Sequence, residues 1–207
     1  MILAIDSASA ACTAALLSID GELIAERHEE LGRGHAERLM PMVADLIGAH
    51  VPSHILVGVG PGSFTGLRVA IAAAHGLAIG WSVPLCGFDS LALVAASVPG
   101  GAANTGGPIG VAMLGGHGEW FVAQYDRDLE LLHPVSSLTP DAAARAITAP
   151  LVVGSAAEAL VARRGSGEAI ATLPRASLAL ALPPGLRSLD PKPVYTRAPD
   201  ARPAVAA

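Results

Sequence analysis

The chain has 207 residues, of which 52% are hydrophobic but only 3% aromatic, and its formal net charge is −5. This length is enough for one large domain or two small ones, with a core built from aliphatic side chains and alanine. The acidic balance argues against a protein that binds nucleic acid by itself, because such affinity comes largely from phosphate contacts. Two cysteines in a chain of this size indicate reduced thiols in a cytoplasmic protein.

The first elements in chain order are three strands and a helix. Ile2–Asp6 and Thr13–Ile19 are predicted as strands, and the Asp20-Gly21 hairpin turn leads into a third strand at Glu22–His28. A helix is predicted over residues 35–49 because apolar residues recur there at helical spacing. Its apolar face consists of Leu39, Met42, Val43, Leu46 and Ile47.

The most informative stretch covers residues 55–80, with the sequence ILVGVGPGSFTGLRVAIAAAHGLAIG. Its apolar beginning, Ile55–Val59, predicts a buried strand. A helix is predicted over Gly66–Ile79, and Ser63 or Thr65 is expected to cap it. Small residues line this helix, so another backbone can approach it closely. The glycine-rich turn between strand and helix comprises Gly60, Gly62, Ser63, Thr65 and Gly66.

The turn lacks the fingerprints of the common phosphate-binding loops. Leu67 follows Gly66 where a Walker A loop requires lysine, and the only lysine of the chain is Lys192. Gly60-Pro61-Gly62 does not extend into GxGxxG either. We therefore favour a tight connection into a packed helix, with anion binding at the helix N-terminus as the alternative.

The same helix raises the question of a membrane. The segment Val69–Leu85 is apolar enough to resemble a membrane span. His75, Ser82 and Pro84 interrupt it, and it has the period of a packed helix. We therefore expect no contact with a membrane.

The remaining elements repeat the order of the first ones. A strand at Val83–Gly87 and a helix opened by Asp89 or Ser90 complete the first unit, and residues 99–108 have the composition of a linker. Residues 164–207 form a tail rich in proline and arginine, with one helical piece at Ala176–Leu182. The elements predicted between linker and tail are strands at Ile109–Met113, Glu119–Tyr125, Leu129–Pro134 and Leu151–Val153, and helices at Asp141–Ile147 and Ser155–Arg163.

This order predicts an α/β fold of the actin-like ATPase (ASKHA) architecture. Each half of that architecture is a ribonuclease-H-like βββαβα unit, and the second unit is reduced here. We expect an N-terminal half at residues 1–98 and a linker at residues 99–108. Residues 109–207 form the shorter C-terminal half with its tail. A fold of this kind does not by itself establish a function.

Five pieces of the chain together resemble one family. They are ILAIDSA with ACTAALL, GHAERLMPMV, GVGPGSFTGLRVAIAAAHGLA, GEWFVAQYD and PKPVYTR. The family is TsaB, also called YeaZ, a paralogue of TsaD in the bacterial synthesis of threonylcarbamoyladenosine in tRNA. The resemblance covers most of the chain and is strongest over residues 1–95.

The resemblance implies a non-catalytic partner of TsaD, the protein that transfers the threonylcarbamoyl group. The ATPase TsaE joins this assembly, which modifies the adenosine 3′ of the anticodon in tRNAs that read codons beginning with A. On this reading the chain meets tRNA only through the complex and forms a homodimer in isolation. The alternative is an enzyme in its own right, either a weak ATPase or a metallopeptidase of the glycoprotease type.

The resemblance also implies that the two N-terminal helices form the partner interface. The alternative is that the apolar face of these helices packs on the chain's own sheet, and one helix has room for both. The residues expected at the interface are His35, Leu39, Met42, Val43, Leu46, Ala70, Ala73 and Ala74.

No catalytic residue, cofactor or metal site is predicted. TsaD-like proteins hold a metal with an HxxxH pair on a helix, but His35 is followed four residues later by Leu39. An acidic residue that relatives show near Leu114 is also missing. Asp6, Ser7 and the single glycine of a strand–helix turn, Gly154, are expected to mark a vestigial nucleotide cleft.

Overall fold

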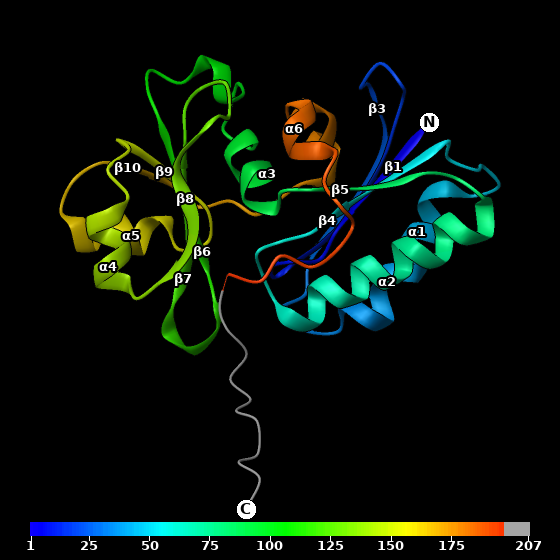
Figure 1. Cartoon of the computed structure of the whole chain (residues 1–207), viewed down its shortest axis with the longest axis horizontal. Helices are drawn as coiled ribbons and strands as arrows, with labels where there is room; N and C mark the ends of the chain where they lie inside the picture. The colour runs from blue at the N-terminus through cyan, green and yellow to red at the C-terminus, as the bar shows by residue number, and fades with distance from the viewer. Residues whose placement is uncertain (197–207) are drawn as a thin grey trace, which may run out of the picture.

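Two five-stranded sheets with the same strand order organise the chain (Figure 1). The computed structural model describes residues 1–196. The sheet orders are β3-β2-β1-β4-β5 and β10-β9-β6-β7-β8, so in each half the first strand is central and the fifth lies at an edge. The prediction of two tandem ribonuclease-H-like units in an actin-like architecture is confirmed.

The first half contains five strands and three helices. Its first three strands form an antiparallel meander, whereas β1, β4 and β5 are mutually parallel. The bounds are β1 Ile2–Asp6, β2 Ala11–Leu17, β3 Leu23–Glu30, α1 His35–Ile47, β4 His54–Gly58, α2 Phe64–Trp81, β5 Leu85–Phe88 and α3 Ser90–Ala96.

The second half repeats this plan with shorter helices, and two short helical segments follow it. The bounds are η1 Ala102–Asn104, β6 Ile109–Leu114, η2 Gly116–Gly118, β7 Trp120–Tyr125, β8 Leu131–Leu138, α4 Pro140–Ala146, β9 Leu151–Val153, α5 Ala157–Arg164, β10 Glu168–Ile170, η3 Ala176–Ala181 and α6 Pro184–Arg187.

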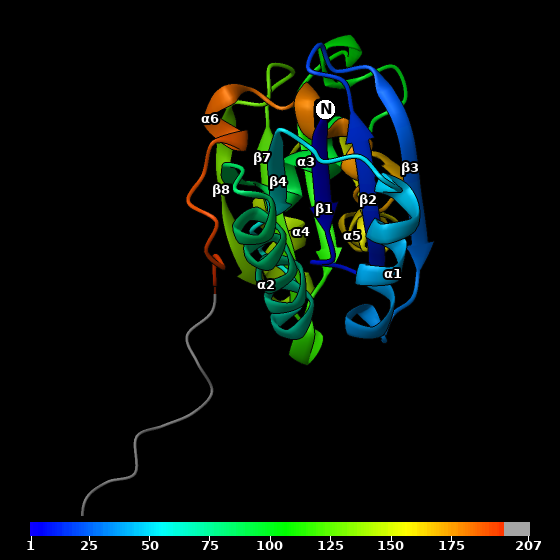
Figure 2. The ribbon, with the colours of Figure 1, turned by 90° about the vertical axis from the view of Figure 1, so that its right-hand side faces the viewer.

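Helices α1 and α2 lie side by side on one face of the first sheet (Figure 2). Their inward residues form one core cluster with alternate residues of β1, β2 and β4. Helix α2 is long and apolar enough to cross a membrane by length and composition alone, and 33% of it is buried inside the protein. It packs on its own sheet through Leu67, Ala70 and Ala74.

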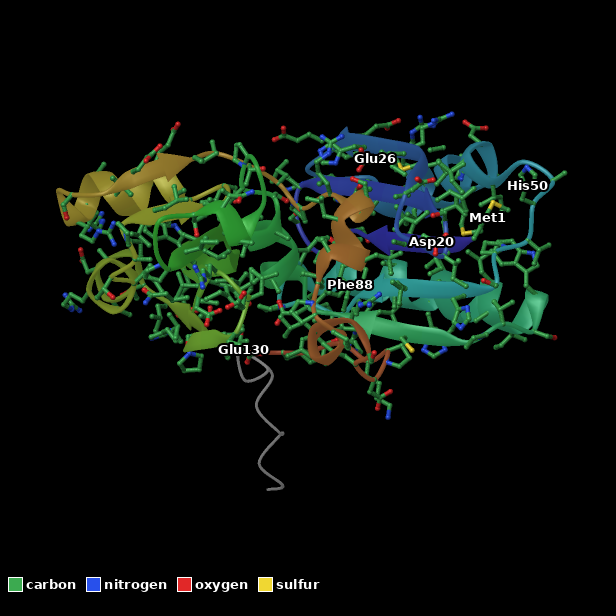
Figure 3. All side chains as sticks on the ribbon, turned by 90° about the horizontal axis from the view of Figure 1, so that it is seen from above. Met1, Asp20, Glu26, His50, Phe88 and Glu130 are labelled. Carbon is green, nitrogen blue, oxygen red and sulfur yellow. The ribbon has the colours of Figure 1, made fainter. Side chains whose placement is uncertain are left out.

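Helix α3 lies between the two halves (Figure 1). All seven of its residues are buried, and six of them, all except Ser90, belong to a core cluster that contains residues of both sheets. Seen from above, Phe88 before this helix lies near the middle of the molecule, and His50 lies at the far end of the first half (Figure 3). The two halves therefore share one core around α3.

The second half has more structure than the sequence predicted. Strand β10 and helix α6 fall in the predicted tail, and the helical piece there is a 3₁₀ helix, η3. Strand β10 has three residues and pairs only with β9. A strand of that length is too short to show an alternating pattern in the sequence.

The last described segment returns to the first half. The Ala176 N–H donates to Thr13 Oγ1 at 3.1 Å, and Leu189 forms an antiparallel bridge with Gly87. Beyond them, the Val194 N–H donates to the Val59 carbonyl at 2.8 Å. The segment after β10 therefore covers parts of β2, β4 and β5, while the division of the chain into domains stays a prediction.

Candidate functional site

Asp6 is enclosed at the carboxyl end of β1. Asp6 as a whole is 0% exposed to solvent. Its Oδ2 accepts a hydrogen bond of 2.6 Å from Ser90 Oγ, and its Oδ1 accepts one of 2.9 Å from the Ala8 N–H. Burial raises the pKa of this carboxyl, and the two hydrogen bonds oppose that shift.

Ser90 connects Asp6 to the glycine-rich turn. Its Oγ accepts a hydrogen bond of 3.2 Å from the Gly60 N–H, and its own N–H donates to the Gly60 carbonyl at 3.1 Å. The sequence indicates Ser90 only as a residue that opens a helix. Its partner Asp6 lies 84 residues away in the chain, so no local pattern indicates the pair.

The glycine-rich turn packs backbone against backbone on the loop that follows β1. Ser63 caps α2 as expected, since its Oγ accepts from the Gly66 N–H at 3.2 Å, whereas Thr65 lies inside the helix. A Cβ atom on Gly62 would lie 2.1 Å from the Ala8 carbonyl oxygen, so the packing leaves room only for glycine there.

The space between the two halves next to this loop is small. A cavity of about 10 Å³ is lined by residues of both halves, among them Ala8, Gly62 and Met113. A volume of this size holds about one water molecule. On the side of the second half, a Cβ atom on Gly154 would lie 2.3 Å from the Ala112 carbonyl oxygen. The nucleotide cleft expected at Asp6, Ser7 and Gly154 stays a prediction.

A second carboxyl, that of the half-buried Asp89, joins the two halves. Asp89 Oδ1 accepts hydrogen bonds of 2.8 Å from the N–H groups of Leu91 and Ala92, and thereby caps α3. The Tyr125 hydroxyl of β7 donates to the same oxygen at 3.5 Å. Burial raises the pKa of both Asp89 and Tyr125.

Most of the residues expected at the partner interface lie on the inward sides of α1 and α2, which face the sheet. His35 is buried at the start of α1, and Ala73 is half-buried. The side chains of the buried residues among them are therefore not accessible at the surface of the protein. The expected interface residues that pack in the chain's own core are Leu39, Met42, Val43, Leu46, Ala70 and Ala74.

The outward side of α1 and α2 includes small and apolar residues among its polar ones. Met40 is 42% exposed and Ile79 is 77% exposed. A Cβ atom on Gly76 or Gly80 would meet nothing within 4 Å, so the chain's own packing does not account for these glycines. The sequence indicates Gly76 as one of the small residues of α2. Because small residues occur on both sides of this helix, the sequence does not separate the outward glycines from the buried alanines, although mid-helix glycine is itself a signal.

The imidazole of His35 is the feature of α1 that bears on metal binding. The Nε2 of His35 is buried without a hydrogen-bond partner among the described residues. Within residues 1–196, no group of three or more His, Cys, Asp or Glu side chains is placed to hold a metal ion.

The two ribonuclease-H-like sheets and the enclosed carboxylate define an actin-like α/β protein in which the glycine-rich turn is a packing element. The family model described as TsaD, tRNA N6-adenosine threonylcarbamoyltransferase, matches residues 24–184. The chain therefore belongs to the family that this model describes, and within it to the TsaB (YeaZ) group.

Known relatives agree with this assignment. The Escherichia coli protein named tRNA threonylcarbamoyladenosine biosynthesis protein TsaB is 39% identical over 135 residues, which are 61% of this chain and 55% of that protein. An uncharacterised Mycobacterium leprae protein is 36% identical over 221 residues, covering 100% of this chain and 57% of that protein. The chain thus spans about half the length of these curated relatives.

Solved structures match over nearly the whole chain. A Pseudomonas aeruginosa protein described as similar to the peptidase YeaZ superposes with a TM-score of 0.77 at 27% identity, covering 95% of this chain and 99% of that one. The structure described as YeaZ from the same organism gives a TM-score of 0.75, also at 27% identity, and covers 94% of this chain and 98% of that one.

Proposed function

We propose that this chain is a non-catalytic partner in the synthesis of threonylcarbamoyladenosine in tRNA. It pairs with a TsaD-like protein through the outward side of α1 and α2, and a TsaE-like ATPase joins the pair in the cytoplasm. tRNA meets the chain only through this complex. In the absence of its partner, the chain forms a homodimer through the same helices.

The observation that carries the proposal is the outward side of α2. Glycine inside a helix costs about 0.5–1 kcal/mol relative to alanine. Gly76 and Gly80 destabilise α2 in this way, although no other part of the described chain packs against them. Close approach of a second backbone makes such glycines useful. The exposed Met40 and Ile79 add apolar area that a partner covers.

The enclosure of Asp6 supports a non-catalytic role. A carboxylate that positions a phosphate or a metal must reach it, and both oxygens of Asp6 are already engaged by Ser90 and by the Ala8 N–H. The alternative of a weak ATPase or metallopeptidase gains no comparable support from the site.

Reconstitution tests this proposal directly. The purified chain is combined with the host's TsaD-like and TsaE-like proteins, tRNA, ATP and an activated threonylcarbamoyl donor, and threonylcarbamoyladenosine in tRNA is measured by nucleoside mass spectrometry. We expect modification only when all three proteins are present. Full modification without this chain, or modification by this chain without the TsaD-like protein, would overturn the proposal.

Variants of α2 test the interface. Gly76→Arg places a long charged side chain on the outward side, and we expect a folded protein that no longer pairs with the TsaD-like protein and is monomeric by light scattering. Ala74→Arg is unsuitable, because Ala74 is fully buried and the change would disrupt folding. Arg145→Glu on α4 is a control far from α2. Unchanged pairing of the Gly76→Arg protein would place the interface elsewhere.

A further inference from the structure

Two exposed aromatic rings and an arginine form a compact cluster where α2 begins. Phe64 and Tyr195 are 57% and 48% exposed, and their ring centroids lie 5.6 Å apart. The guanidinium carbon of Arg68 lies 3.7 Å from the centre of the Phe64 ring. Its Nε also donates a hydrogen bond of 3.0 Å to the Tyr195 hydroxyl. We call Phe64, Arg68 and Tyr195 the aromatic platform.

The C-terminal segment holds the platform in one arrangement. The Val194 N–H donates to the Val59 carbonyl at 2.8 Å, which fixes the backbone next to Tyr195. His75 Nε2 lies 3.2 Å from the Pro191 carbonyl oxygen and ties the same segment to α2. Little side-chain freedom is therefore lost when a partner covers the platform, and such preorganisation favours binding.

The platform lies on a different flank of α2 from α1. Figure 2 shows α2 between α1 and the segment that follows α6. The contacts of His75 and Arg68 with Pro191 and Tyr195 place these side chains on the flank that faces this segment. A partner on the outward side of α1 and α2 therefore leaves room for another protein at the platform.

We propose that the aromatic platform docks an acidic segment of a second partner protein, in which a carboxylate lies between apolar side chains. Any partner that covers the two rings also covers Arg68. No carboxylate within residues 1–196 pairs with this guanidinium. A covered charge without a counterion is costly, so the partner supplies a carboxylate, which a guanidinium binds through two parallel hydrogen bonds.

The composition of the platform fits a protein rather than RNA. Tyrosine and arginine are enriched among the residues that dominate protein interfaces. RNA affinity depends on several phosphate contacts, but Arg68 is the only Lys or Arg in residues 55–82. The nearby Lys192 is paired with Asp190 at 2.6 Å, and the chain carries a net charge of −5.

The inference rests on the proposed function, because the second partner is sought in the same complex. The probe is the host's TsaE-like ATPase, added to the preformed pair of this chain and the TsaD-like protein and measured by isothermal titration calorimetry. The variants are Arg68→Glu and the double substitution Phe64→Ala with Tyr195→Ala. Arg145→Glu is the matched charge reversal, and circular dichroism confirms that each variant is folded.

We expect Arg68→Glu to weaken binding of the ATPase by about tenfold or more, as for an interface hot spot, and to leave pairing with the TsaD-like protein within about twofold. The double variant also weakens binding of the ATPase, and Arg145→Glu does not.

Unchanged binding of the ATPase by both platform variants overturns the inference while the proposed function stands. Loss of pairing with the TsaD-like protein instead assigns the platform to the first interface and also overturns it. A wild-type chain that binds neither protein removes the proposed function and the inference together. An effect of Arg68→Glu on binding of a fluorescent tRNA anticodon stem-loop, without any on the ATPase, identifies RNA as the occupant and overturns it as well.

Discussion

Ser7 and Gly66 are 59 residues apart in the chain, yet their backbones are in direct contact. Ser7 Oγ donates a hydrogen bond of 2.8 Å to the Gly66 carbonyl oxygen. A Cβ atom on Gly66 would lie 2.0 Å from the Ser7 carbonyl oxygen. The start of α2 is thus pressed onto the loop after β1, and this contact closes the end of the sheet where Asp6 lies.

Substitution by alanine is expected to change the free energy of unfolding in opposite directions at different glycines. Gly66→Ala and Gly62→Ala force a side chain into a backbone carbonyl, so each should lower the free energy of unfolding by about 2 kcal/mol or more. Gly76→Ala meets open space and should raise it by about 0.5–1 kcal/mol while it weakens pairing with the TsaD-like protein. Urea unfolding measures all three variants. A destabilised Gly76→Ala protein would contradict this account.

Ser90→Ala should destabilise the fold more than its position in a short helix suggests. The change leaves Asp6 Oδ2 and the Gly60 N–H without a buried partner, at a cost of about 1–3 kcal/mol. Ser97→Ala, at the other end of α3, removes only a bond to the Leu93 carbonyl and should cost much less. Equal urea midpoints for the two variants would show that the Asp6–Ser90 pair does not stabilise the fold.

The raised pKa of Asp6 predicts a specific pH dependence. Between its ordinary value of 3.8 and its higher value in the folded protein, the folded state binds more protons than the unfolded state. The free energy of unfolding therefore falls as the pH rises through this window, and the loss is complete above the folded pKa.

Asp6→Asn tests this dependence, since it removes the titrating group and should flatten the decrease relative to the wild-type protein. Because Asp89 shifts in the same direction, only the difference between the two proteins is diagnostic. Glu37→Gln on the exposed side of α1 is the control. Parallel pH profiles for wild type and Asp6→Asn would contradict the assignment.

The two cysteines should differ in reactivity. Burial raises the pKa of the fully enclosed Cys12 thiol to about 11, whereas Cys86 is only half-buried. At pH 8 only about one Cys12 in a thousand is a thiolate, the reactive form. Titration with a disulfide reagent should therefore modify one thiol quickly in the native protein and both in urea. Cys86→Ser should remove the fast phase, and a fast phase that persists would contradict the prediction.

Local patterns in the sequence determined most elements of both halves, but not β10 or α6. The Asp20-Gly21 turn, the helical spacing of Leu39 and Met42, and the Ser63 cap each depend on residues within a few positions of one another. Short-range sterics and hydrogen bonds decide such features, so the sequence alone predicts them. The repeated order of elements then indicated the two-sheet architecture.

Only the tertiary structure decided which side chains face inward and what encloses Asp6. Small residues on every side of α2 look alike in the sequence, so packing against the sheet separates the buried Ala74 from the exposed Gly76. Asp6 meets Ser90 only because the carboxyl end of β1 and the start of α3 lie together at the same end of the sheet. The return of Tyr195 to α2 is likewise a long-range contact. Such contacts depend on how whole elements pack, and no local pattern specifies that.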